Sequence, residues 1–253
     1  MEPREVISLA PSLVSYQEAL QTIIKLAGKR ESSFVCFANV HMTVEAYLRP
    51  GFRNLLHRAR LITADGMPLA KSLNYLYGIH QERIAGMDMM QDVLAACEKD
   101  SLSVYLFGST DRLLNILQVK IRQRHPGLKI AGVFSPPFGK FSPENSRQYC
   151  QRINESGADL VLVCLGCPKQ EIWMAENFAA VKAVMLGVGG AFEVYAGLKK
   201  RAPRWMQNLS LEWLYRLLQD PGRLMKRYVV TNSIFVFLLA RQLLLMRLPG
   251  RSR

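Results

Sequence analysis

The sequence of 253 residues predicts an α/β protein built around a mainly parallel sheet, with helices on both faces. Short apolar runs rich in β-branched residues alternate with longer amphipathic runs, which is the pattern of repeated strand–helix units. Several apolar runs end in glycine or a polar residue directly before a helical run, as expected where parallel strands open onto a ligand site. Beyond Ala196 the strand pattern stops and the chain becomes helical and basic.

Six apolar runs have the length and composition of buried strands. They are residues 34–38, 61–64, 104–107, 130–134, 160–165 and 184–188. The amphipathic runs predict helices near residues 15–28, 67–77, 87–99, 111–124, 143–156 and 169–179. We therefore expect one α/β domain over residues 1–195 and a helical appendage over residues 196–253.

The formal net charge of +13 is concentrated at the C-terminus. Residues 196–253 hold twelve basic and two acidic side chains, so this segment carries +10 of the total. Such a segment attracts polyanions, which include nucleic acid, anionic lipid and phosphorylated substrates.

Pro203 and the Asp220-Pro221-Gly222 turn divide the appendage into two predicted helices. The second, roughly residues 223–246, has basic ends and an apolar middle interrupted by polar residues. A membrane-spanning helix needs about 20 predominantly apolar residues, so we expect this one to lie in the interface of an anionic membrane. Its boundary anchors would be Trp205, Trp213, Tyr215 and Tyr228. The alternative is a core-packing helix with solvated ends.

A nucleic-acid-binding tail is the main alternative function for this basic segment. It requires aromatic side chains interleaved with cations for base stacking, whereas the aliphatic run IFVFLLARQLLLM dominates the last helix. Lipid is therefore the favoured partner, and no nucleic acid is expected.

The cysteines predict a reducing compartment. Positions 36, 97, 150, 164 and 167 show no framework spacing, which favours free thiols in the cytosol. A redox or zinc pair of Cys164 and Cys167 is disfavoured because no second pair or nearby histidine accompanies it, so both are expected to serve in packing. The first residues carry acids and lack a long apolar core, so no signal peptide is expected.

Asp65 follows the predicted strand at 61–64 and precedes a predicted helix. A carboxylate at a strand end can accept a proton from a hydroxyl nucleophile, and partial burial raises its pKa toward a working value. Asp65 can equally cap the following helix. From this segment alone, capping is favoured.

Two further strands end in glycine. Gly166-Cys167-Pro168 leads into a helix whose free amides, together with Lys169 and Gln170, suit a diphosphate or a sugar hydroxyl. Residues 187–190 form a glycine cluster followed by Glu193, which is either a close backbone approach to a ligand or an ordinary tight connection. Its spacing departs from GxGxxG, which disfavours a nicotinamide-dependent oxidoreductase.

Five segments of the chain occur in one characteristic order: ADGMP, RIAGMD, GCPKQE, GVGGAFE and KRAPRWMQNLSLEWLYRLLQDPGR. In order and spacing they resemble the WecG/TagA/CpsF family of bacterial glycosyltransferases, over roughly residues 30–227. The resemblance implies a Rossmann-like body and inverting transfer of a hexose or N-acetylhexosamine, for example of the N-acetylmannosamine type. The donor would be a UDP-sugar and the acceptor an undecaprenyl-diphosphate-linked sugar.

The resemblance also implies a place for the enzyme. It would act as a peripheral protein at the cytoplasmic face of the bacterial inner membrane, in surface or exopolysaccharide biosynthesis. An oligomer is compatible with the sequence. No cofactor is expected, and no metal, because the seven Asp residues include no Asp-x-Asp pair and the four histidines show no ligand spacing. Cations and amides would then neutralise the leaving diphosphate.

Site residues are implied by the same resemblance. Asp65 becomes the general base on the acceptor hydroxyl, in place of a helix cap. Side chains implied to line the sugar and diphosphate pocket are Asn39, Arg83 and Gln170. Glu193, where family members usually have Asp, lies near the nucleobase, and Phe37 stands where many members have a hydroxyl residue. The appendage is implied to close over the site and to present Arg216, Arg223 and Lys226 to the diphosphate.

Overall fold

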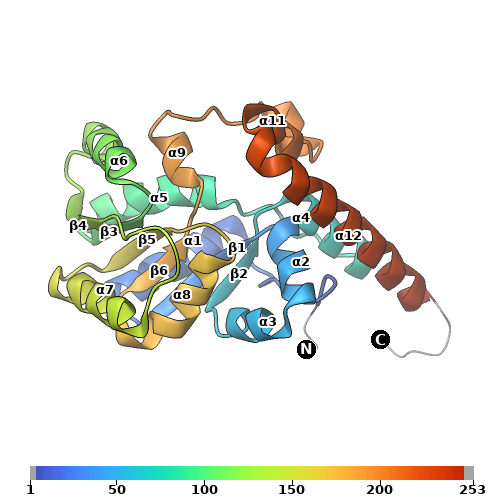
Figure 1. The fold of residues 1–253 in the computed structure, drawn as a ribbon, viewed down its shortest axis with the longest axis horizontal. Coiled ribbons are helices and arrows are strands. Elements are labelled where there is room, and N and C mark those ends of the chain that lie inside the picture. Colours follow the sequence, from blue (N-terminus) through green and yellow to red (C-terminus); the bar gives the residue numbers. More distant parts are fainter. Residues whose placement is uncertain (1–3, 248–253) are drawn as a thin grey trace.

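The computed structural model describes residues 4–247 and contains one sheet of six parallel strands in the order β2-β1-β6-β5-β3-β4 (Figure 1). The strands are β1 (Ser33–Ala38), β2 (Leu61–Ala64), β3 (Ser103–Gly108), β4 (Lys129–Phe134), β5 (Leu160–Cys164) and β6 (Val184–Gly187). Every strand pair is parallel. The α/β fold class is confirmed, and each predicted strand lies within one residue of its observed bounds.

Helices cover both faces of the sheet because each strand buries alternate side chains on opposite sides. In β1, Phe34 and Cys36 belong to one apolar core, and Val35 and Phe37 belong to the other. The second core is completed by α1 (Tyr16–Gly28), α5 (Gly86–Lys99), α6 (Asp111–Arg124) and α9 (Ala191–Tyr195). The core that contains Phe34 and Cys36 is completed by α2 (Val40–Leu48), α3 (Pro50–Leu56), α4 (Met67–Tyr77), α7 (Pro143–Glu155) and α8 (Lys169–Asn177). A short 3-10 helix, η1 (Phe178–Ala180), follows α8.

The helices α2 and α3 were not predicted. They connect the neighbouring parallel strands β1 and β2, which require a crossover between them. Asn39 caps α2, with its side-chain oxygen accepting a hydrogen bond from the Met42 amide at 3.2 Å. Pro50 lies in the first turn of α3, where a missing amide hydrogen costs nothing. Pro50-Gly51 therefore starts a helix here, although the same pair is common in turns.

The sequence predicts two helices in the appendage, but its described residues, 196–247, form three. They are α10 (Arg204–Asn208), α11 (Glu212–Gln219) and α12 (Pro221–Arg247). Ser210, in the left-handed region at φ 66°, separates α10 from α11. Asp220 ends α11 and Pro221 is already the first residue of α12, so the expected turn at 220–222 is a direct helix-to-helix junction.

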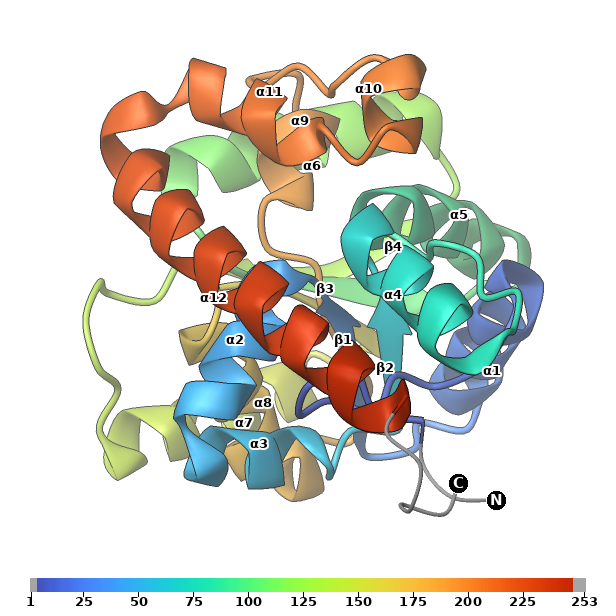
Figure 2. The ribbon, with the colours of Figure 1, turned by 90° about the vertical axis from the view of Figure 1, so that its right-hand side faces the viewer.

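The long helix α12 lies along the body, and one side of it is buried. Figure 2 shows it crossing in front of α2, against which it packs. Its buried side chains are Leu224, Thr231, Phe235 and Leu238. Near its end, Gln242 accepts from the Ile7 amide and donates to the Glu5 carbonyl, both at 2.8 Å. Its opposite side remains exposed and apolar.

By length and composition, α12 is also the one helix among residues 4–247 that could cross a membrane. Only a small share of its apolar stretch is buried within the protein. This is weak support for membrane association.

Candidate active site

The candidate site lies where four neighbouring strands end. β2, β1, β6 and β5 are adjacent in the sheet, and their carboxyl ends therefore meet at one edge. Asn39 follows β1, Asp65 follows β2, Gly166 follows β5 and the glycines 189–190 follow β6. The strand order brings together segments that are up to 150 residues apart in the chain.

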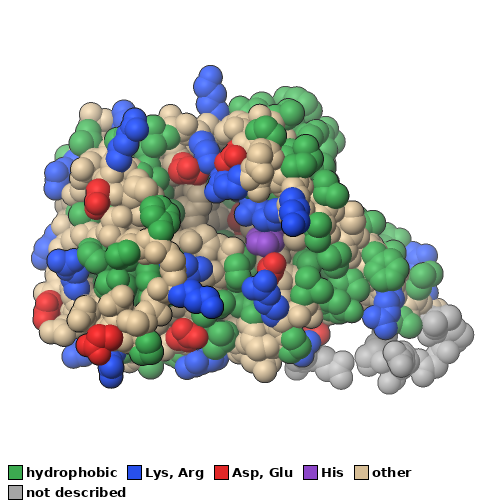
Figure 3. All heavy atoms as spheres, in the orientation of Figure 1, with side chains coloured by type: hydrophobic (Ala, Val, Ile, Leu, Met, Phe, Trp, Pro, Cys, Tyr) green, Lys and Arg blue, Asp and Glu red, His purple; other side chains and the backbone are tan. Residues whose placement is uncertain are grey.

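A cavity of about 930 Å³ separates this sheet edge from the appendage. Figure 3 shows the hollow, with Lys and Arg side chains around it and hydrophobic side chains continuing over α12. Six of the predicted site residues line it: Asn39, Asp65, Gln170, Glu193, Arg216 and Arg223. Its volume is that of a small-molecule site rather than of a packing defect.

Asp65 does not cap the helix that follows it. The N-cap of α4 is Gly66, without any side-chain capping bond, and the Asp65 carboxylate accepts no hydrogen bond from residues 4–247. Burial first, and then the nearby charge of Glu212, raise the pKa of Asp65 to about 7, against the opposite effect of Arg216 and Arg83. A carboxylate with this pKa is suited to accept a proton near neutral pH.

Gln170 organises the loops around the cavity. Its side-chain oxygen accepts from the Gly189 amide at 3.2 Å, and its nitrogen donates to Glu171 at 2.9 Å. A Cβ on Gly187 would lie 2.5 Å from this nitrogen, so the close approach requires glycine. The resemblance places Gln170 at the ligand. In this structure it is buried and bonded on both sides, so it also positions the glycine loop.

Glu193 lies at the far side of the cavity, on α9. Its carboxylate pairs with Lys199 at 2.8 Å, which fixes the first residues of the appendage beside it. Phe37 stands where the resemblance implies a hydroxyl residue in many family members. Its side chain is buried and lies against Gly86, where an added Cβ would be 3.1 Å from the phenyl ring.

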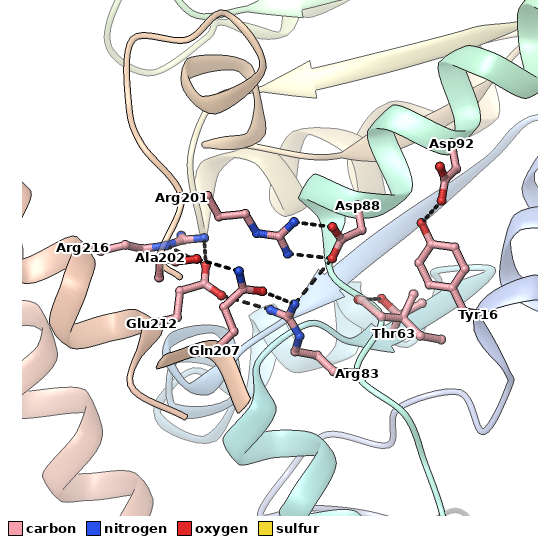
Figure 4. Close-up of polar contacts among 11 residues, drawn as sticks. Tyr16, Thr63, Arg83, Asp88, Asp92, Arg201, Ala202, Gln207, Glu212 and Arg216 are labelled. Carbon is pink, nitrogen blue, oxygen red and sulfur yellow. Dashed lines mark hydrogen bonds and ion pairs between the residues drawn. The ribbon is translucent and has the colours of Figure 1, made fainter. Parts of the chain in front are cut away.

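Arg83 joins the body to the appendage instead of lining the cavity (Figure 4). From the loop before α5 it donates to Glu212 at 3.0 Å and to Gln207 at 2.8 Å, and it approaches Asp88 at 3.5 Å. Arg201 from the appendage forms a second ion pair with Asp88. The Arg83 side chain is only 12% exposed, so these charged contacts are partly desolvated. We call Arg83, Asp88, Arg201, Gln207 and Glu212 the clasp.

Lys169 and Lys226 also lie outside the cavity lining. The Lys169 ammonium stands 3.6 Å from the centre of the Phe141 ring, a cation–π contact that directs it elsewhere. Lys226 is exposed on the outer side of α12. By contrast, Arg216 and Arg223 line the cavity and are held by carboxylates of the appendage, Glu212 at 3.1 Å and Asp220 at 2.7 Å.

The sequence did not single out the other members of the clasp. Glu212, Asp88, Arg201 and Gln207 are ordinary polar residues in helical or basic segments, and only tertiary contacts bring them together. The available signals were two of the quoted segments: RIAGMD contains Asp88, and the long C-terminal motif contains Arg201, Gln207 and Glu212.

The cysteines and histidines show no arrangement typical of a metal site. Within residues 4–247, no cluster of three or more His, Cys, Asp or Glu side chains could hold a metal ion. All five cysteines are free. Burial raises the pKa of the Cys164 thiol to about 12, which makes it unreactive and agrees with the packing role expected for it.

One protein-family model matches nearly the whole chain. The model of the family described as "Glycosyl transferase WecG/TagA/CpsF family" matches residues 4–248. The match extends over the sheet, the clasp and α12, and it covers all nine residues that the sequence predicted for the site.

Proposed function

The chain belongs to the WecG/TagA/CpsF family of glycosyl transferases, and on that premise we propose that it transfers a hexose or N-acetylhexosamine from a UDP-sugar to an undecaprenyl-diphosphate-linked sugar. The proposed reaction inverts the anomeric carbon, needs no metal, and serves bacterial surface or exopolysaccharide biosynthesis. The observation that carries the proposal is the Asp65 carboxylate. It accepts no hydrogen bond from residues 4–247, lines the cavity and has a pKa of about 7.

In the proposed mechanism, Asp65 takes the proton of the acceptor hydroxyl as that oxygen attacks the anomeric carbon. The new C–O bond forms on the face opposite the breaking bond to UDP, so the configuration inverts. Negative charge then develops on the departing diphosphate. The Gly190 amide and the guanidinium groups of Arg216 and Arg223 would stabilise it, each at the level of a few kcal/mol.

A screen of UDP-sugars for protection against thermal unfolding tests this function. A true donor stabilises the folded protein by mass action, and it should then yield UDP and an elongated lipid in the presence of a polyprenyl-diphosphate-linked sugar. Failure of every UDP-hexose and UDP-N-acetylhexosamine to stabilise the protein or release UDP would contradict the proposal.

The acid limb of the pH profile should report on Asp65. The base must be deprotonated to act, so kcat/KM is expected to fall about tenfold per pH unit below a pKa of about 7. Initial rates of UDP release from pH 5.5 to 9 measure this limb. A rate that stays constant down to pH 5.5 would assign the base to a carboxylate with an ordinary pKa.

We further propose that α12 holds the enzyme at the cytoplasmic face of the inner membrane. Its outward side chains include Phe237 at 68% exposed and Leu244 at 67%, seven residues apart and so on one side of the helix. Basic residues lie toward both ends of the helix, which suits anionic lipid.

Replacing Phe237 and Leu244 by serine should weaken binding to anionic liposomes about a hundredfold or more. Each buried apolar side chain contributes roughly 1.5–3 kcal/mol, so the two together contribute roughly 3–6 kcal/mol. Co-sedimentation measures the effect. Phe138→Ser is the matched control, because Phe138 is 88% exposed on the body, far from α12 in the chain. Undiminished liposome binding by the double variant would contradict this role of α12. Tight binding of an oligonucleotide in place of liposomes would favour the alternative of a nucleic-acid-binding tail.

A further inference from the structure

One guanidinium group of the cavity has no carboxylate partner among residues 4–247. Four guanidinium groups line the cavity, and three of them form ion pairs: Arg201 with Asp88, Arg216 with Glu212, and Arg223 with Asp220. The fourth is Arg227, on α12. Within residues 4–247 it has no salt-bridge partner, and its Nε is buried without any hydrogen-bond acceptor. Such a buried donor is costly unless a ligand satisfies it.

His41, on α2, presents a second unsatisfied group to the same part of the cavity. Its Nδ1 is buried without a hydrogen-bond partner, and His41 lines the cavity together with Arg227. The helices α2 and α12 pack against each other, so His41 and Arg227 line the cavity from neighbouring elements. Burial first, and then the charge of Arg227, lower the pKa of His41. Glu45, one turn further along α2, pairs with Arg49 at 3.2 Å. Together His41 and Arg227 make a place for an anion.

The cavity becomes apolar beyond this pair. Phe235, Val236 and Leu239 of α12 line it, and Met67 and Tyr75 of α4 contribute to the same lining. With a rise of 1.5 Å per residue, Phe235 lies about 12 Å along α12 from Arg227. A ligand that fits has an anionic head and an apolar chain, and in this respect it differs from a nucleoside diphosphate.

We propose that His41 and Arg227 bind the diphosphate of the lipid-linked acceptor, and that the apolar lining along α12 holds its first isoprenoid units. This inference rests on the proposed function, because it assigns a binding site to the acceptor of that reaction. Arg227 donates guanidinium N–H groups, and His41 donates from Nδ1 in the tautomer that carries its proton there. The donor diphosphate remains at the glycine loop, near Arg216. The cation that binds the diphosphate of the lipid-linked acceptor is thus Arg227, whereas its neighbour Lys226 is exposed to solvent.

Binding of farnesyl diphosphate, measured by calorimetry without vesicles, tests the assignment. Arg227→Gln should raise its Kd about tenfold or more, and His41→Gln should raise it to a smaller extent, because each removes a donor to a charged group. The Kd for UDP should change less than twofold in both variants. Arg241→Gln removes the same charge from an exposed position of α12 and is expected to bind farnesyl diphosphate like the wild type.

The NMR resonances of the histidines in the wild-type protein supply a second test, which does not depend on whether a variant folds. Bound farnesyl diphosphate should raise the pKa of His41, because an adjacent anion favours the imidazolium form. Inorganic diphosphate should bind more weakly than farnesyl diphosphate.

Three results would overturn the inference: a normal Kd in Arg227→Gln, an equal loss of UDP binding in that variant, or equal affinity for inorganic and farnesyl diphosphate. Absence of transfer from every UDP-sugar, with farnesyl diphosphate still bound through Arg227, would instead refute the proposed reaction and leave this site standing.

Discussion

Asp65→Asn is expected to lower the rate of sugar transfer about a thousandfold or more while UDP-sugar binding stays nearly unchanged. A general base contributes about 10²–10⁴ to the rate, and the asparagine amide fills the same space but cannot accept the proton. The carboxylate makes no hydrogen bond that the body needs, so folding should be preserved. UDP release under saturating substrates and calorimetric binding of the UDP-sugar measure the two effects.

The matched control is Asp100→Asn, which alters an exposed carboxylate at the end of α5, outside the cavity. It should retain full activity. Transfer by Asp65→Asn at the wild-type rate would remove Asp65 from the role of base. Equal loss of transfer and of donor binding would make Asp65 a donor-binding residue.

Asp65→Asn should also stabilise the folded protein, because the raised pKa of Asp65 lowers the free energy of unfolding at neutral and higher pH. Between the ordinary pKa of 3.8 and about 7 the unfolded chain releases this proton while the folded protein holds it. This loss of stability is therefore absent below about pH 4 and complete above about pH 7. After allowance for exposure of the carboxylate to the cavity, Asp65→Asn should gain about 1–2 kcal/mol at pH 8 and almost nothing at pH 4. Urea unfolding at the two pH values measures the difference.

The strand ends of the site were predictable because they depend on local pattern. An apolar run followed by Asp65, or by the glycines before Glu193, marks the end of a strand wherever that strand lies in the sheet. The order β2-β1-β6-β5 is not a local property. It is this order that brings Asp65 and Glu193 to one cavity, and only the family resemblance anticipated that they belong to one site.

The appendage shows where sequence reasoning failed and why. Its charge was evident, but adjacent residues of a helix point about 100° apart. Lys226 and Arg227 are therefore not interchangeable, and the packing of Leu224 and Phe235 decides which of them faces the cavity. Arg83 is similar. A motif marks it as important, but Gln207 and Glu212, its partners from the appendage, lie more than 120 residues away in the chain.

Arg83→Met should lower transfer at pH 7 about fiftyfold or more by opening the clasp. Removing one partner of a partly buried ion pair costs about 3–5 kcal/mol, most of it from the charge left behind. Glu212 would lose its link to the body, and the appendage that carries Arg216 would close less often over the site. Limited proteolysis of residues 197–220 should accelerate in this variant. Arg147→Met, which breaks an exposed ion pair with Glu144, is the control.

The pH profile separates this role of Arg83 from direct contact with the donor. Arg83 lowers the pKa of Asp65 and Glu212 raises it. In Arg83→Met the acid limb should therefore move to higher pH, and in Glu212→Gln it should move to lower pH, in opposite directions although both variants weaken the clasp. If Arg83 instead binds the donor, its loss should weaken UDP-sugar binding and leave the acid limb of Asp65 in place. The two roles thus predict different measurements from one variant, because the clasp residues also set the charge around the base.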